Sequence, residues 1–310
     1  MATLTARISL KGDEPDGPED YLSTSLGVIF PDDIVNQHGD AEHSLLYASP
    51  KLPKTLLIEL ADPEGETDRR LFSHYLWNAS LLLAELIERD SLDDEEEEKQ
   101  DRGLGGDISF DTRGLHTLEL GAGTALPSIM AGLLGAAGVV VTDYPAPAVM
   151  KTLRENVARN IKPDLAPVGK SSLITTSILV EGHEWGVFDS SSAFPSSHAH
   201  LSDRLFVADC LWMPWQHENL RRSIGYFLKK SAEARAWVVA GFHTGRAKMA
   251  PFFDAKALRE EGGVEVERMW ERDCDGVERE WDSEREDDIT ERKRWLVVCV
   301  LKRCEGMVDA

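Results

Sequence analysis

The sequence has few cysteines and too few basic residues for a nucleic-acid-binding protein. Its 310 residues include four cysteines, and no two of them form a C-x-x-C pair. We expect reduced thiols, because a chain of this size can build a core without disulfides. The 34 basic and 55 acidic residues give a net charge of −21. Nucleic acid is therefore not an expected partner, since phosphate neutralisation supplies most of that affinity, whereas a basic protein or a small molecule is compatible with this charge.

The sequence also lacks a recognisable leader and an unbroken membrane span. Its first residues, MATLTARISLKGDEPDG, contain no apolar segment typical of a secretory signal. Residues 120–142 carry no charge and would be long enough to cross a membrane. Glycines and Pro127 interrupt this run, so we expect a turn, a helix and a strand there. The protein is accordingly predicted to be cytoplasmic, monomeric and not associated with a membrane.

Residues 117–144, reading TLELGAGTALPSIMAGLLGAAGVVVTDY, form the most informative stretch. They predict a strand, a glycine turn, a helix from near Thr124 and a second strand that stops at Asp143. Gly121 and Gly123 let the backbone turn sharply beneath a ligand. Asp143 follows the second strand, where a carboxylate can accept hydrogen bonds from both hydroxyls of a ribose. The stretch is typical of half a nucleotide-binding α/β unit.

The third glycine of the dinucleotide fingerprint G-x-G-x-x-G is missing here. Leu126 occupies its position, although that glycine normally allows close helix packing beside the pyrophosphate. Glu119 lies two residues before Gly121, where a carboxylate would repel a pyrophosphate and attract a cation. These differences favour a sulfonium nucleoside with an ammonium group over a dinucleotide.

The segments before this stretch predict an irregular arm, a strand and a helix. Residues 1 to about 55 are an arm that either packs loosely or covers the ligand mouth. A strand is expected at 54–63, and an amphipathic helix from Leu71, with Trp77 near its start either in the core or at a ligand. The acidic run 93–98 predicts a surface loop within 89–107, or a docking site for a basic partner.

Strands alternate with helices in the second half of the chain. This alternation predicts a mainly parallel sheet with helices on its faces. Two histidines at 198 and 200 are interpreted as loop residues, because no cysteine or carboxylate lies at zinc-ligand spacing. The expected strands are 173–180, 204–210, 236–242, 264–271 and 294–303, and the expected helices are 146–160, 211–230 and 243–262, with a charged loop at 272–293.

Five motifs resemble a known family. ELGAGTALPSI and VVVTDYP resemble motif I and the acidic motif of seven-stranded S-adenosylmethionine-dependent methyltransferases. HYLWNASLLLAELI, HEWG and ADCLW resemble methyltransferase family 16, a lysine methyltransferase group that includes fungal nicotinamide N-methyltransferase-like proteins and relatives that methylate elongation factor 1-alpha. The resemblance implies an α/β, Rossmann-like sheet, mostly parallel with an antiparallel last strand, in a domain over 71–303. An arm and strand at 1–70 precede it, and a tail at 304–310 follows.

The resemblance also implies roles for individual residues. Trp77 would pack on S-adenosyl-L-methionine, the glycine turn would pass under its methionine portion, Asp143 would hold the ribose and Trp185 would flank the adenine. Trp212 departs from the family pattern Asp-x-x-Tyr/Phe, which leaves the usual substrate open. No metal is expected. The full implied cofactor site is Trp77, Glu119, Gly121, Ala122, Gly123, Asp143, Tyr144, Trp185 and Ala208.

Asp209 is the candidate catalytic residue, together with Trp212. We expect Asp209 to orient an amine and accept its hydrogen bond, while Trp212 and Trp215 offer aromatic faces to the cationic product. Asp209 would alternatively cap a helix. The predicted function is S-adenosylmethionine-dependent N-methylation of a protein lysine or N-terminal amine, for example in a translation factor. A small amine such as nicotinamide is the alternative substrate, and a cofactor-binding module without activity is disfavoured by Asp209.

Overall fold

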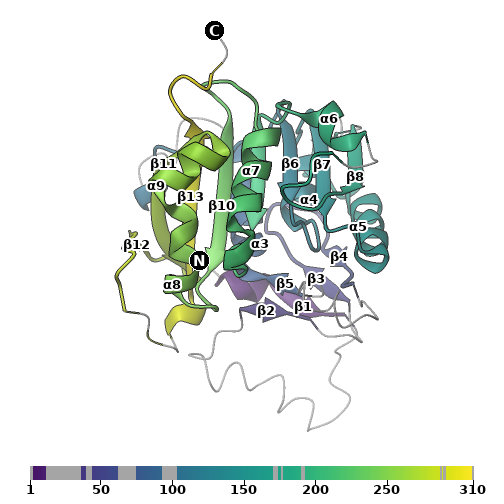
Figure 1. Cartoon of the computed structure of the whole chain (residues 1–310). Helices are drawn as coiled ribbons and strands as arrows, with labels where there is room; N and C mark the ends of the chain where they lie inside the picture. The colour runs from purple at the N-terminus through teal and green to yellow at the C-terminus, as the bar shows by residue number, and fades with distance from the viewer. Residues whose placement is uncertain are drawn as a thin grey trace.

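A computed structural model shows an α/β fold built on one large sheet (Figure 1). The acidic run 93–98 and much of the N-terminal arm lie outside the residues that the structure describes. Both interpretations of that run therefore stay predictions. The described residues are 3–11, 36–39, 44–61, 75–92, 103–169, 174–175, 177–189, 193–286, 288 and 291–308.

The large sheet has eight strands in the order β12-β11-β13-β10-β9-β6-β7-β8. The five strands from β10 to β8 run parallel, and β13 is antiparallel to both β10 and β11. This confirms the predicted Rossmann-like sheet with its antiparallel last strand. The bounds are β6 His116–Leu120, β7 Gly138–Asp143, β8 Ile178–Gly182, β9 Arg204–Ala208, β10 Arg235–Gly241, β11 Val264–Asp273, β12 Glu278–Glu280 and β13 Trp295–Arg303.

Helices cover both faces of the sheet. One apolar cluster joins the sheet to α3 (Asn78–Leu92), α4 (Leu126–Leu133) and α5 (Pro147–Asn160). A second cluster joins its other face to α7 (His217–Phe227) and to the segment 249–258. The layering explains why β9 and β10 are so apolar, since strands covered on both faces carry buried residues on both faces. Shorter helices are α6 (Phe194–His198), α8 (Arg246–Met249) and α9 (Ala255–Ala257).

The N-terminal segments form two small sheets at one end of the molecule (Figure 1). Strands β1 (Ile8–Leu10), β3 (Leu45–Tyr47) and β4 (Leu56–Ile58) make an antiparallel sheet that joins the first apolar cluster. Strand β2 (Gln37–His38) pairs with β5 (Leu76–Trp77), directly before α3. The described part of the arm is therefore packed against the domain, which contradicts the interpretation as a loose leader for these residues.

Several predicted elements differ in their bounds. Trp77 precedes α3 instead of lying inside a helix, and the strand expected at 173–180 runs from Ile178 to Gly182. The strand expected at 54–63 is confined to Leu56–Ile58. The helix predicted at 243–262 is broken into short turns, because Gly245 has a φ of 91° and Pro251 cannot donate a helical hydrogen bond.

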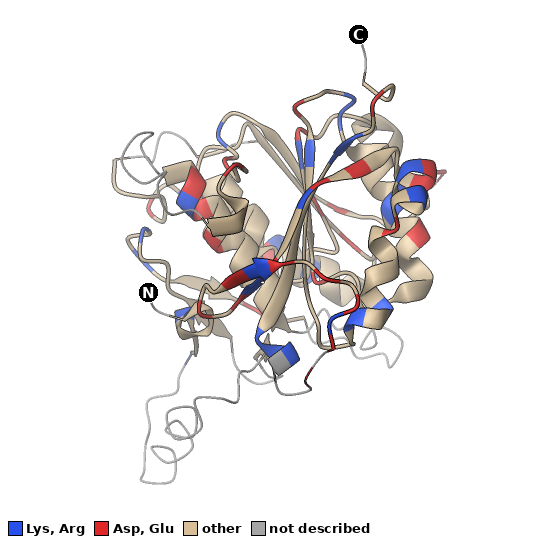
Figure 2. Ribbon diagram, turned by 90° about the vertical axis from the view of Figure 1, so that its left-hand side faces the viewer, with Lys and Arg blue, Asp and Glu red and all other residues tan. Residues whose placement is uncertain are grey.

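The charged loop predicted at 272–293 contains an additional strand, β12. The segment is held by buried Glu271, whose carboxylate pairs with Arg246 at 2.6 Å, Arg279 at 2.7 Å and Arg285 at 2.8 Å. Elsewhere, charged residues are found mainly on helices, loops and the outer strands, while the central strands are almost uncharged (Figure 2). The four cysteines are buried and unpaired, as predicted. Among the described residues, no helix is long and apolar enough to span a bilayer.

Candidate active site

A pocket lies at the carboxyl ends of the parallel strands, where the strand order reverses. From β6, the strands β7 and β8 follow on one side. The next strand along the chain, β9, pairs with β6 on its other side. In open α/β sheets this switch point is where ligands bind. The pocket is lined by Tyr75, Trp77, Ser80, Gly121, Ala122, Gly123, Thr124, Asp143, Tyr144, His183, Glu184, Trp185, Ala208, Asp209, Cys210, Trp212, Met213 and Gln216.

The lining contains every predicted site residue except Glu119 and Trp215. Among the described residues that line it, three side chains are carboxylic acids, namely Asp143, Glu184 and Asp209, and none is Lys or Arg. A pocket with this composition favours a cation over an anion. The structure thus brings together residues from the ends of β5, β6, β7, β8 and β9 that lie far apart in the sequence.

The glycine turn after β6 forms the floor of the pocket. Gly121 has a φ of 66° and Gly123 one of 54°, in the left-handed region that favours glycine. A Cβ on Gly121 would come within 2.8 Å of both Cys210 Sγ and the Trp185 ring, so the turn packs tightly on that side. A Cβ on Gly123 would meet nothing within 4 Å. Gly123 therefore leaves open space where a ligand can approach the backbone.

Asp143 is fixed at the end of β7 by two backbone amides. Gly123 N donates to its Oδ2 and Tyr144 N to its Oδ1, each over 2.7 Å. Burial raises the pKa of Asp143 to about 6, although both amides act in the opposite direction. Each carboxylate oxygen can accept more than one hydrogen bond. The ionised side chain therefore keeps acceptor positions for the two hydroxyls of a ribose, and its cofactor role stays a prediction.

Glu119 lies beneath the turn and does not reach the pocket. Its side chain is fully buried; Oε2 accepts a hydrogen bond of 3.2 Å from Ser128 N, and Oε1 has no hydrogen-bond partner among the described residues. Burial raises the pKa of Glu119 to about 8, and the nearby Asp143 adds to this rise. The carboxyl is thus mostly neutral at pH 7. The sequence pattern assigns to Glu119 the negative charge that attracts a sulfonium. In the structure, Asp143 and Asp209 are the carboxylates that can supply this charge in the pocket.

Aromatic rings from two distant segments border the pocket. Trp77 ends β5 and contacts Tyr75 edge to face, with 6.0 Å between ring centroids. Trp185 lies in the HEWG segment after β8, and Gly186 N in that segment donates 2.8 Å to Ser223 Oγ of α7. Both tryptophans are partly exposed and line the pocket. They are not simple core residues, and their rings are available to a planar ligand.

Asp209 follows β9 in a strained backbone conformation. Its φ is 58°, uncommon for a residue other than glycine, and such strain is often found at functional sites. Gly241 N donates 3.3 Å to its Oδ1. Burial raises the pKa of Asp209, while His243 and the Gly241 amide lower it. The alternative that Asp209 caps a helix is wrong, because α7 begins only at His217.

Two tryptophans follow Asp209 along the same loop. Trp212 lines the pocket, and Trp215 meets it edge to face at 6.5 Å while remaining 72% exposed. His217 anchors this loop, since its Nε2 lies 2.9 Å from Leu211 O. Trp212 thus lines the pocket and Trp215 lies beside it, outside the pocket lining, so the expected aromatic wall stays a prediction. An exposed indole of this kind is suited to contact an incoming substrate.

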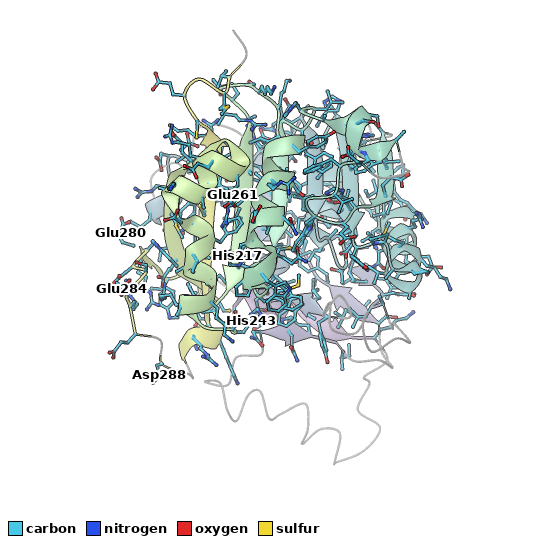
Figure 3. The ribbon with its side chains drawn as sticks, viewed as in Figure 1. His217, His243, Glu261, Glu280, Glu284 and Asp288 are labelled. Carbon is cyan, nitrogen blue, oxygen red and sulfur yellow. The ribbon has the colours of Figure 1, made fainter. Side chains whose placement is uncertain are left out.

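His243 was missed in the sequence. It follows β10, its ring stacks on Trp77 with 4.8 Å between centroids and 22° between planes, and its Nδ1 lies 3.8 Å from Asp209 Oδ1. Figure 3 shows it below His217, toward the end of the molecule where the small sheets lie. No local motif signals this residue. The only sequence clue was its position just after a buried strand next to the one that carries Asp209.

His198 and His200 hydrogen-bond to main-chain carbonyls. His198 Nδ1 lies 3.1 Å from Phe194 O, and His200 Nδ1 lies 3.2 Å from Leu228 O. Within the described part of the chain, no group of three His, Cys, Asp or Glu residues is placed to hold a metal. Both histidines thus have structural roles.

Solved structures share this fold. A putative SAM-dependent methyltransferase from Streptococcus mutans superposes with a TM-score of 0.51 and 11% identity, over 85% of this chain and 56% of that one. A putative methyltransferase complexed with SAH gives 0.50 and 12%, over 85% and 57%. At these identities the two structures show the fold, an α/β methyltransferase-type sheet, that this chain shares with them.

The family comparison identifies the chain more closely. A family model described as lysine methyltransferase matches residues 65–257, and the chain belongs to this family, methyltransferase family 16. A relative in Gibberella zeae, named protein N-terminal and lysine N-methyltransferase EFM7, is 31% identical over 66% of this chain and 70% of that protein. The protein of the same name in Aspergillus fumigatus is 30% identical over 67% and 70%. The chain is thus a methyltransferase, as its motifs predicted.

Proposed function

We propose that the protein transfers a methyl group from S-adenosylmethionine to an amine of a protein substrate, either a lysine side chain or an N-terminal amine. The observation that carries this proposal is the position of Asp209, beside the glycine turn and in the same pocket as Asp143. One carboxylate is thus available to the cofactor and another to the substrate. Relatives in Gibberella zeae, Aspergillus fumigatus and Schizosaccharomyces pombe are named for the same protein amines.

The residues present fit the cofactor. Gly123 gives its backbone open space, Asp143 offers acceptors for ribose hydroxyls, and Trp77 and Trp185 offer rings for the adenine. The acidic lining suits a molecule that carries a sulfonium and an ammonium group. When bound, S-adenosylmethionine supplies the methyl group as an electrophile. We propose that these residues hold it, with Ala122, Tyr144 and Ala208 completing the lining.

The chain's task is then to align a neutral amine with the cofactor. Asp209 Oδ accepts a hydrogen bond from the substrate nitrogen and aims its lone pair at the methyl group. Alignment of two reactants in one site lowers the barrier by roughly 7–11 kcal/mol in favourable cases. Trp212 and Trp215 hold the substrate side chain at the entrance, because aromatic faces attract ammonium groups.

Two finer expectations belong to this proposal. The resemblance noted from the sequence motifs suggests a translation factor as the substrate, and the net charge of −21 favours a basic protein surface. We also expect a monomeric, cytoplasmic enzyme. We also propose that the N-terminal arm helps to hold Trp77 at the pocket, because β2 of the arm pairs with β5, the strand that carries Trp77.

Methyl-labelled S-adenosylmethionine incubated with the protein and a cell lysate tests the proposal. We expect label in a discrete protein band whose acid hydrolysate contains N-methylated lysine or an N-methylated terminal residue. A parallel reaction with nicotinamide and other small amines serves as the comparison. Label confined to the small-molecule fraction would replace the protein substrate with the small-amine alternative, which the names of the relatives do not favour.

A further inference from the structure

The turn after β10 places an imidazole between two residues of the pocket. His243 Nδ1 lies 3.8 Å from Asp209 Oδ1. The imidazole ring stacks on the Trp77 ring, with 4.8 Å between the ring centroids. Asp209 belongs to the proposed substrate end of the pocket and Trp77 to the proposed cofactor end. A single side chain therefore contacts both ends without itself lining the pocket.

This imidazole is only partly exposed and its turn is anchored. The His243 side chain is 17% exposed, and its Nδ1 has no hydrogen-bond partner within the described part of the chain. Gly245 N donates 2.8 Å to Phe242 O, which closes the turn. Three residues after His243, Arg246 pairs with Glu271 at 2.6 Å and lies 4.1 Å from the centre of the Phe242 ring. The ring position is thus fixed by a network outside the pocket.

The geometry makes Asp209 the natural partner of Nδ1. A buried nitrogen without a hydrogen bond is costly, and Asp209 Oδ1 is the acceptor toward which it lies. Catalytic hydrogen bonds are often long in the absence of ligand and tighten when the complex forms. The carboxylate already has one fixed donor in Gly241 N at 3.3 Å. A second donor from His243 would leave one direction of the carboxylate for the substrate.

We propose that His243 is a positioning residue for methyl transfer, which rests on the proposed role of Asp209: Nδ1–H orients the Asp209 carboxylate toward the substrate amine, and the imidazole ring supports Trp77 against the cofactor. The two functions use different parts of the side chain. The donor acts on the substrate end of the pocket, and the ring face acts on the cofactor end. They are therefore separable by substitution.

Two variants separate the functions. His243→Phe keeps a ring against Trp77 and removes the donor, so we expect kcat to fall about tenfold or more, as for loss of a hydrogen bond to a charged group, with the cofactor Kd unchanged. His243→Asn keeps a donor near the position of Nδ1 and removes the ring. We expect it to retain most of kcat and to weaken cofactor binding about threefold to tenfold, the range of a lost stacking contact.

A second aspartate and histidine pair supplies the matched control. His116 is the first residue of β6, so it lies at the end of this strand away from the pocket. Its Nδ1 lies 3.6 Å from Asp203 Oδ2, and its side chain is 63% exposed. His116→Phe should leave kcat, KM and cofactor Kd unchanged. Thermal unfolding of all variants reports on folding. If His243→Phe does not fold, His243→Leu, which lacks both the donor and the ring, should lose kcat and cofactor affinity together, and unchanged values of both would overturn the inference.

The readouts are kcat and KM for the labelled protein substrate and the calorimetric Kd for S-adenosylhomocysteine. The expected pattern is loss of kcat in His243→Phe, its recovery in His243→Asn, and weaker cofactor binding only in the Asn variant. Equal kcat in the Phe and Asn variants, whether reduced or normal, would overturn the inference. Asp209→Asn, measured beside them, distinguishes failure of the His243 inference from failure of the proposed function. Full turnover in Asp209→Asn would remove the proposed role of Asp209 itself.

Discussion

The backbone amide of Gly123 donates a hydrogen bond of 2.7 Å to Asp143 Oδ2, and this contact joins the turn after β6 to the end of β7. Twenty residues separate the two groups in the sequence, yet together they form the floor of the pocket. Because Tyr144 N holds the other carboxylate oxygen, the side chain cannot rotate freely. The carboxylate is held in place before any ligand arrives, which lowers the entropic cost of binding.

Asp143→Asn tests this arrangement. The amide has nearly the same volume but only one acceptor oxygen, so it cannot accept from both Gly123 N and Tyr144 N. We expect cofactor affinity to fall at least tenfold, or about 1.4 kcal/mol. Calorimetric titration with S-adenosylhomocysteine measures the change, and a normal thermal unfolding midpoint shows that the variant folds. An unchanged Kd would remove Asp143 from the cofactor site.

The same carboxylate predicts a pH dependence of binding. The pKa of Asp143 is raised to about 6 by burial, so the group is ionised at pH 7.5 and largely protonated at pH 5. A protonated carboxyl has fewer acceptor positions for a ribose. Cofactor affinity of the wild type should therefore fall as the pH drops through 6, and Asp143→Asn should lack this component. The contrary result is the same pH dependence in both proteins.

Gly121 and Gly123 form a matched pair. Both have a positive φ, for which alanine costs roughly 1–2 kcal/mol, but only Gly121 would place its Cβ 2.8 Å from Cys210 Sγ and the Trp185 ring. Gly121→Ala should lower the free energy of unfolding more than Gly123→Ala. Gly123→Ala should weaken cofactor binding, since its Cβ would enter the open pocket. Chemical denaturation and calorimetry distinguish the two, and equal destabilisation would contradict the packing argument.

Glu119→Gln should change how stability depends on pH. Burial raises the pKa of Glu119 to about 8 from an ordinary value of 4.5. Between these values the folded state retains a proton that the unfolded state loses, so the wild type loses stability as the pH rises, by about 3 kcal/mol from this group at pH 7. The glutamine variant lacks this loss. Denaturation of both proteins at pH 5 and 7.5 measures it; a constant difference between them would show that Glu119 is ionised throughout.

The local pattern around residues 117–144 predicted its structure well. Strand β6, the glycine turn, α4 and β7 occur in the expected order, because each depends on residues that are neighbours in the sequence. The role of Glu119 was misjudged for the opposite reason. Its position two residues before Gly121 could be seen, but its burial beneath the turn depends on helix α4, where Ser128 N is its partner.

Contacts between distant segments could not be predicted. His243 meets Asp209 because β9 and β10 are adjacent and parallel, and it meets Trp77 because β5 lies at the same end of the sheet. Strand β12 has a charged sequence that indicates a loop. It pairs with β11 since Arg279 contacts buried Glu271 and lies over the Trp295 ring. Periodicity carries no information about such partners.

The most direct measurement of the central claim is the comparison of turnover and cofactor affinity in Asp209→Asn. Asparagine is the matched substitution, because it tolerates the φ of 58° that alanine would adopt with strain. The proposed role predicts a loss of methyl transfer of about tenfold to 100-fold, as for loss of a hydrogen bond to a charged group, with the S-adenosylhomocysteine Kd changed less than about twofold. Normal turnover, or a parallel loss of turnover and cofactor binding, would contradict a separate substrate role for Asp209.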